Sequence, residues 1–166
     1  MSDDALMAPA SVPGAECRIE ALHDNTLILI MSHLFARQAV QTCVLSRRWR
    51  NLWRSVPRIN ILPDEFYGIT DPDVDRDVVF KTFVDSFFML RNPSPLDELQ
   101  LWFDLSDRCY SEDANLWIRH ALECTARSVK VTIRFYFLRL APAVFASGRN
   151  LTRLHLSSVR LPRESF

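Results

Sequence analysis

The stretch AVQTCVLSRRWRNLWRSVP, residues 39–57, determines how the first part of the chain folds. Its apolar residues at i, i+3, i+4 and i+7 are Trp49, Leu52, Trp53 and Val56. This spacing places them on one face of a helix, with the arginines of the stretch on the other faces. Ser46 is a suitable N-cap, and Pro57 ends the helix.

Two further amphipathic helices are predicted upstream. The first, which Asp24 can cap, has an apolar face of Leu27, Ile30, Met31 and Leu34. The second has an apolar stripe of Ala39, Val40, Cys43 and Val44. Three such short helices present more apolar surface than so small a module can bury internally, so the sequence predicts a partner for it.

From residue 79 onward, helical and extended segments alternate three times. A helical stretch rich in phenylalanine leads into the extended segment LDELQLWFDL (96–105). A helix expected at 112–126 leads into the β-rich run SVKVTIRFYF (128–137). The same order then repeats in a shorter form, up to NLTRLHLSSVRLP (150–162). This order predicts a fold that mixes helices and strands.

The extended segments share the spacing L-x-x-L-x-L. It is met by Leu96, Leu99 and Leu101, more loosely by Ala126, Val129 and Val131, and fully by Leu151, Leu154 and Leu156. Aligning Leu99, Val129 and Leu154 gives steps of 30 and 25 residues, close to the length of a leucine-rich repeat. A register shifted by two residues in the middle unit, on Val131 and Ile133, stays open. Such units bury their apolar faces only by stacking, which predicts a parallel, right-handed, curved solenoid.

Residues 22–61, and above all the string VLSRRWRNLW within them, resemble the F-box of plant-type F-box/leucine-rich-repeat proteins. In that family the F-box docks on a Skp-type adaptor bound to a cullin, and the repeats hold a target protein. A separate RING and conjugating-enzyme pair then transfers ubiquitin. The resemblance implies an α+β chain with a three-helix F-box and a short, apparently truncated leucine-rich-repeat solenoid. It also implies a non-catalytic substrate-recognition subunit of an SCF-type cullin-RING ubiquitin ligase, acting in ubiquitin-dependent degradation without a cofactor.

Four regions are expected along the chain. They are a disordered leader at 1–17, an F-box at 18–61, a linker at 62–78 and a partial leucine-rich-repeat domain at 79–166. The last strand is followed directly by VRLPRESF, which offers no segment to cap a solenoid. We therefore expect the front part of a longer receptor, or a shortened receptor.

Carried over position by position, the resemblance implies two sets of site residues. The adaptor-facing candidates are Leu22, Leu27, Ile30, Leu34, Val40, Val44, Leu45, Trp49, Leu52 and Trp53. Some of these must instead hold the three helices together, and the sequence does not sort them. In a solenoid, side chains that alternate with the buried ones line the concave face, so the target-contact candidates are Gln100, Trp102, Lys130, Thr132, Arg134, Arg153 and His155.

Three positions depart from the family pattern. Members usually carry prolines where this chain has His23 and Phe35, and a leucine where it has Thr26. A proline at the start of a helix preorganises the entry of the chain without loss of a hydrogen bond. These departures bear on affinity for the adaptor rather than on the fold.

Composition excludes several classes of protein. The 166 residues are 48% hydrophobic, and 20 Lys and Arg balance 20 Asp and Glu, so the chain gives no global field for nucleic acid or an anionic membrane. No apolar run approaches the roughly 18 residues of a membrane span, and the acidic start lacks a secretory signal. Four scattered cysteines in such a chain are expected to be reduced, in the cytoplasm or nucleus.

Other functions are weighed against this one. Interleaved Arg and Trp also fit a nucleic-acid-binding helical module that would use Arg47, Arg48, Arg50, Arg54 and Arg58. A degenerate F-box protein that no longer binds the adaptor is a further alternative. Asp71, Asp73 and Asp75 imitate a calcium loop but lack its Gly and Glu, and His120 with Cys124 lacks further metal ligands. No motif of an enzyme site is present.

Overall fold

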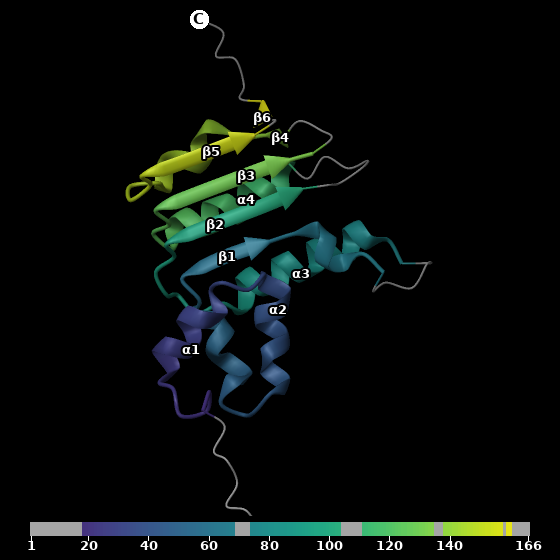
Figure 1. The fold of residues 1–166 in the computed structure, drawn as a ribbon. Helices are drawn as coiled ribbons and strands as arrows, with labels where there is room; N and C mark the ends of the chain where they lie inside the picture. Colours follow the sequence, from purple (N-terminus) through teal and green to yellow (C-terminus); the bar gives the residue numbers. More distant parts are fainter. Residues whose placement is uncertain (1–17, 69–73, 104–110, 135–137, 158, 161–166) are drawn as a thin grey trace, which may run out of the picture.

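The computed structural model describes residues 18–68, 74–103, 111–134, 138–157 and 159–160. A module of short helices lies at one end, and a parallel sheet with helices on one face lies next to it (Figure 1). The leader expected at 1–17 and part of the expected linker fall outside the described residues.

The helical module, residues 18–56, contains α1 (Asp24–Met31), α2 (Ala36–Gln41) and the 3-10 helices η1 (Thr42–Val44) and η2 (Trp49–Ser55). Two sequence predictions were wrong in detail. The N-cap position of α1 is His23, whose extended backbone precedes the helix, and not Asp24. The third helix begins at Trp49 rather than after Ser46, and it is a 3-10 helix that buries Trp49 and Trp53.

A strand that the sequence analysis did not predict follows the helical module. It is β1 (Arg58–Ile61), which leads through η3 (Pro63–Phe66) to α3 (Arg76–Leu90). The helix begins earlier than residue 79, because the side chain of Asp75 accepts a hydrogen bond from the Asp77 amide and caps it. The sheet therefore begins directly after the helical module.

The later elements alternate as predicted. They are β2 (Glu98–Phe103), α4 (Ser111–Glu123), β3 (Ser128–Ile133), β4 (Leu138–Arg139), η4 (Pro142–Ser147), β5 (Arg153–Ser157) and β6 (Val159–Arg160). The main sheet has the order β1-β2-β3-β5, and every pair in it is parallel. Leu99 lies opposite Val129, and Val129 lies opposite Leu154, so the unshifted register is confirmed.

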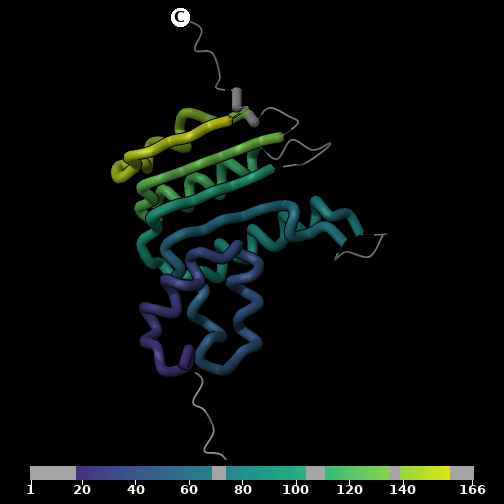
Figure 2. Tube along the Cα trace, in the orientation of Figure 1, coloured from purple at the N-terminus to yellow at the C-terminus, as the bar shows by residue number. Residues whose placement is uncertain are grey.

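Strict alternation of burial divides the two faces of the sheet. Leu99, Leu101, Val129 and Val131 are fully buried, and the residues between them are partly exposed. The tube in Figure 2 shows the strands stacked in chain order. Helices α3 and α4 lie behind the sheet, while its other face carries no described helix. We call this second surface the open face. Among the described residues, no helix is long and apolar enough to span a membrane.

The third unit is covered less than the first two. Its helical segment is the 3-10 helix η4, and β5 forms an edge of the main sheet. Leu154 fits the leucine spacing but is 45% exposed, and Leu151 and Leu156 are only partly buried. The apolar spacing is therefore present in the sequence without a complete core around it.

Candidate functional site

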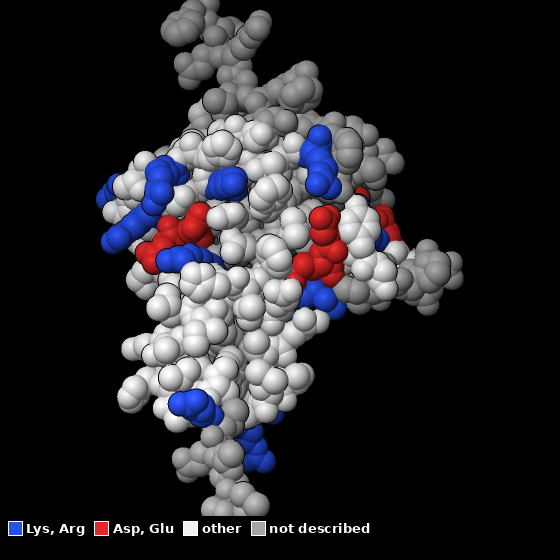
Figure 3. Space-filling model, in the orientation of Figure 1, with Lys and Arg blue, Asp and Glu red and all other residues white. Residues whose placement is uncertain are grey.

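The helical module exposes large apolar side chains although it has a well-filled core. Val44 is 83% exposed and Leu45 63%, and Leu29, Ile30 and Phe35 are also exposed. In the view of Figure 3, the surface over α1 and α2 shows few charged groups, which are basic, whereas charged groups of both signs gather over the sheet. A surface with few charges and exposed aliphatic side chains is suited to burial against another protein.

The structure sorts the adaptor-facing candidates into three groups. Leu27, Trp49 and Trp53 lie in the core, with at most 6% of each exposed. Leu22, Leu34, Val40 and Leu52 are partly buried and pack against that core. Ile30, Val44 and Leu45 are exposed and free to meet a partner. Helical spacing selects residues on one stripe, so it missed Leu29 and Phe35, which lie off the stripe but are exposed.

The arginines near the tryptophans do not form a single basic patch. Arg48 donates to Asp24 at 2.7 Å and to the carbonyl oxygens of Glu20 and Leu22, which ties the third helix to the start of the module. The guanidinium of Arg54 lies over the Trp53 ring at 5.8 Å. Two of the five arginines proposed for nucleic-acid binding thus have contacts inside the module, and Arg58 lies on β1 in the sheet.

A buried junction joins the helical module to the sheet. The guanidinium of Arg91, at the end of α3, donates to the carbonyl oxygens of Val56 at 2.6 Å and Ser94 at 3.2 Å. Burial lowers the pKa of Arg91, and the neighbouring Cys124 sulfur opposes that shift. The rings of Trp53 and Phe87 also meet here, with centroids 5.1 Å apart. Both parts share one apolar core, so they form one packed unit.

The open face brings the target-contact candidates together. Gln100 lies opposite Lys130, Lys130 opposite His155, and Trp102 opposite Thr132, so these side chains form rows across β2, β3 and β5. Arg153 is exposed on β5, and Arg134 follows β3, where its amide donates to the Phe103 carbonyl at 3.0 Å. The ammonium of Lys130 lies 5.3 Å from the centre of the Trp102 ring. The structure therefore places these residues on or next to one face of the sheet, and their contact with a target stays a prediction.

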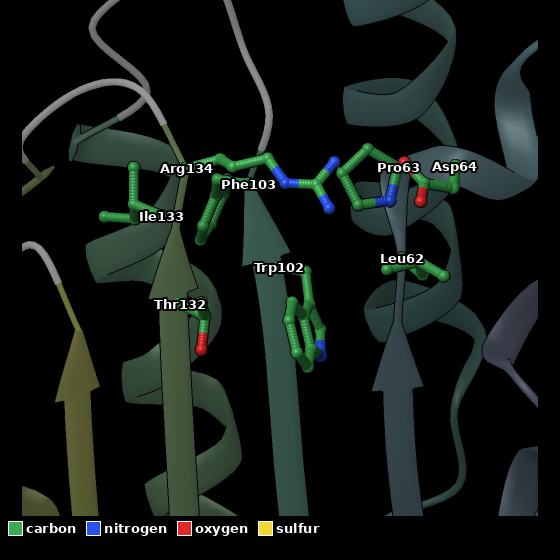
Figure 4. A pocket seen from close by; sticks show the side chains of 8 residues that line it. All are labelled: Leu62, Pro63, Asp64, Trp102, Phe103, Thr132, Ile133 and Arg134. Atoms are coloured by element: carbon green, nitrogen blue, oxygen red, sulfur yellow. The ribbon is translucent and has the colours of Figure 1, made fainter.

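A cavity of 330 Å³ lies where three parallel strands end. Its lining residues are Leu62, Pro63 and Asp64 after β1, Trp102 and Phe103 on β2, and Thr132, Ile133 and Arg134 at the end of β3. Figure 4 shows Arg134 extending across the end of β2 toward Pro63 and Asp64, with the Trp102 ring below it. Clefts at the carboxyl ends of parallel strands are common places for ligands in α/β sheets.

Comparison with known proteins agrees with these features. The F-box domain family matches residues 19–60, which cover nearly all of the helical module and β1. The chain contains an F-box, and its relatives are plant F-box proteins. The F-box thus supplies the exposed apolar side chains described above.

Three relatives from Arabidopsis thaliana show how much of this chain the similarity covers. An FBD-associated F-box protein is 32% identical over 151 residues, which is 89% of this chain and 34% of the relative. An F-box protein is 33% identical over 156 residues, 89% of this chain and 36% of the relative. An F-box/FBD/LRR-repeat protein is 33% identical over 110 residues, 65% of this chain and 23% of the relative. The chain spans about a third or less of the length of these three curated relatives.

No solved structure matches the chain. Within the described residues, no group of three or more His, Cys, Asp or Glu is placed to hold a metal ion. His120 packs edge-on against Phe88, with ring centroids 5.4 Å apart, and Cys124 is a partly buried free thiol. Asp71 and Asp73 lie outside the described residues, and Asp75 caps α3.

Proposed function

We propose that this chain is the substrate-recognition part of an SCF-type cullin-RING ubiquitin ligase. Its F-box binds a Skp-type adaptor, and through the adaptor a cullin, while its sheet holds a target protein. The observation that carries the proposal is the exposure of Val44 and Leu45 in a module whose own core is already filled. Burying one such aliphatic side chain on association contributes about 1–2 kcal/mol, after allowance for the part already buried.

We further propose that the sheet and its helices are leucine-rich repeats. Three units, α3 with β2, α4 with β3 and η4 with β5, repeat the order of helix and strand, and their leucine positions lie opposite one another. In repeats of this kind each unit packs only on its neighbours, and the strand face without helices serves for binding. Here that surface is the open face.

The junction gives this arrangement a mechanical consequence. Because Arg91 and the pair Trp53 and Phe87 fix the F-box on the sheet, a target on the open face is held at a set orientation to the adaptor. A receptor of this kind positions the target and catalyses nothing itself, since catalysis belongs to other subunits. The setting in which it acts is the cytoplasm or the nucleus.

The proposal is tested by titrating the purified chain with a Skp-type adaptor at low and at high salt. An interface built on aliphatic side chains predicts an affinity that changes little with salt. No binding to the adaptor would identify a degenerate F-box. Tight binding to DNA or RNA that weakens steeply with salt would instead support a nucleic-acid-binding module, because phosphate contacts release counterions.

A further inference from the structure

Trp102 differs from the other tryptophans of the chain. All four lie in the described residues; Trp49, Trp53 and Trp117 are at most 6% exposed, whereas Trp102 is partly exposed on the open face. Its ring borders the cavity together with Leu62 and the buried Pro63. A large apolar ring that remains accessible beside a preformed cavity is a common anchor point for a side chain of a partner.

The charges of the open face are unbalanced in sign. Arg58, Lys130 and Arg153 lie on its strands, together with His155, and Glu98 is the single carboxylate on the described strand residues of that face. None of these three cations forms an ion pair within the described part of the chain. The contrast with other cations is clear, because Arg48 pairs with Asp24 and Lys81 pairs with both Asp85 and Asp113.

We propose that the open face binds an acidic peptide segment of the target protein. One aromatic or large aliphatic side chain of the segment packs on Trp102 and enters the cavity, and flanking carboxylates pair with Lys130 and Arg153. This inference rests on the proposed function, since it names the chemistry of the target that the receptor holds. The acidic character of the peptide is inferred from charge complementarity, which sets specificity and association rate at protein interfaces.

A peptide fits this surface better than single-stranded nucleic acid, which is also acidic and also stacks on aromatic rings. Nucleic-acid grooves use several rings for successive bases, and Trp102 is the one Trp, Tyr or Phe on the open face of the described strands. Carboxylates border the same surface, with Glu98 on β2 and Asp64 on the cavity wall. They would repel a continuous row of phosphates, whereas a peptide can place a neutral or basic residue there.

The cavity volume also suits a peptide. At 330 Å³ it is at the lower end of the range for ligand sites, which is room for one anchoring side chain rather than for an extended cofactor. The cation over the Trp102 ring, 5.3 Å away, can meet a carboxylate beside that anchor. One anchor with adjacent charge pairs defines a short recognition motif.

The test is a selection from a library of random peptides on the immobilised full chain. Peptides that are enriched would be synthesised with a fluorophore, and their affinities measured by anisotropy. We expect enriched peptides to share one Phe, Trp or Leu flanked by Asp and Glu, and to bind more weakly as salt rises. Trp102→Ala and Lys130→Glu should each lower the affinity at least about tenfold, as loss of an interface anchor does.

Controls separate this inference from the proposed function. Arg119→Glu reverses an exposed charge on α4, away from the open face, and should leave peptide affinity unchanged. Adaptor binding, measured on the same preparations, should be unaffected by Lys130→Glu, which also shows that the variant is folded. Loss of adaptor binding alone would count against the proposed function and leave the peptide site standing.

Several results would overturn the inference. They are the absence of any enriched peptide, enrichment of neutral or basic peptides, and an affinity that changes less than about twofold in both open-face variants. Tighter binding of a labelled oligothymidine than of any selected peptide would assign the surface to nucleic acid instead.

Discussion

Replacing Trp53 with alanine should destabilise the fold rather than remove a contact surface. Trp53 is 6% exposed, its ring lies 5.1 Å from that of Phe87, and it sits where the F-box meets the sheet. Truncation of a buried tryptophan costs about 3–5 kcal/mol, from lost burial and from the cavity left behind. Since domains of this size are stable by about 5–15 kcal/mol, Trp53→Ala should lose a large fraction of the total.

Urea unfolding followed by far-ultraviolet circular dichroism measures this loss. Trp102→Ala is the matched control, because it deletes the same side chain from a partly exposed position and should cost less than about 2 kcal/mol. If Trp53→Ala unfolds within about 1 kcal/mol of the wild type, the side chain is not the core residue that the structure shows. In that case Trp53 would return to the list of adaptor contacts.

Three smaller changes give further predictions. His23 has a φ of −67°, the value that proline requires, so His23→Pro should raise thermal stability and adaptor affinity, and a lower melting temperature would refute this; Phe35 has a φ of −66°, but Phe35→Pro should gain less because it loses the hydrogen bond from the Phe35 amide to the Gln38 side chain at 3.3 Å. Burial raises the pKa of Glu65, so the folded state holds the carboxyl proton more tightly than the unfolded state does. The stability that this proton adds is fully present below the unfolded-state pKa and is lost as pH rises through the folded-state pKa. The stability of Glu65→Gln should therefore match that of the wild type in acid and exceed it at neutral pH. Equal stabilities at every pH would contradict a raised pKa of Glu65. Asp85 accepts a hydrogen bond from the indole of buried Trp117 at 2.7 Å, so Asp85→Ala should cost about 1–3 kcal/mol in denaturant unfolding, and an unchanged midpoint would refute it.

The sequence predicted the parts of the fold that depend on simple periodicity. Alternation along β2 and β3 placed Leu99 and Val131 in the core and Gln100 and Lys130 on the opposite face. Leucine spacing left two registers open for the middle unit, two residues apart, because a shift of two keeps the same residues on the buried face; the pairing of Leu99 with Val129 in the structure decides between them. These features follow from the two-residue repeat of a strand.

Other features could not be predicted from the sequence. β1 has four residues, and only Ile59 and Ile61 mark it, so the strand is recognisable only through its pairing with β2. Apolar spacing gave one list for the adaptor surface, although Trp49 turns inward and Val44 outward. Which apolar residue of a short helix is buried depends on neighbouring helices, and tertiary packing decides this rather than local pattern.

The cavity is formed by three segments that are far apart in the chain and could not be predicted from any one of them. Pro63, Trp102 and Arg134 lie close together because β1, β2 and β3 are adjacent and parallel, and β1 was not predicted. The sequence did identify Trp102 and Arg134 as target-contact candidates, since each belongs to the alternating set on a strand or just beyond it. It gave no sign that a cavity lies between them.

Adaptor binding by a variant of the exposed F-box surface tests the central claim most directly. The double variant Val44→Asp with Leu45→Asp changes two side chains that are 83% and 63% exposed, so the fold should persist. Met89→Asp is the matched control, since Met89 is 81% exposed on α3, outside the F-box. Calorimetric titration with a Skp-type adaptor should show binding by the wild type and Met89→Asp, and at least about thirtyfold weaker binding by the double variant. Equal affinity in all three chains would contradict the assignment of this surface to the adaptor.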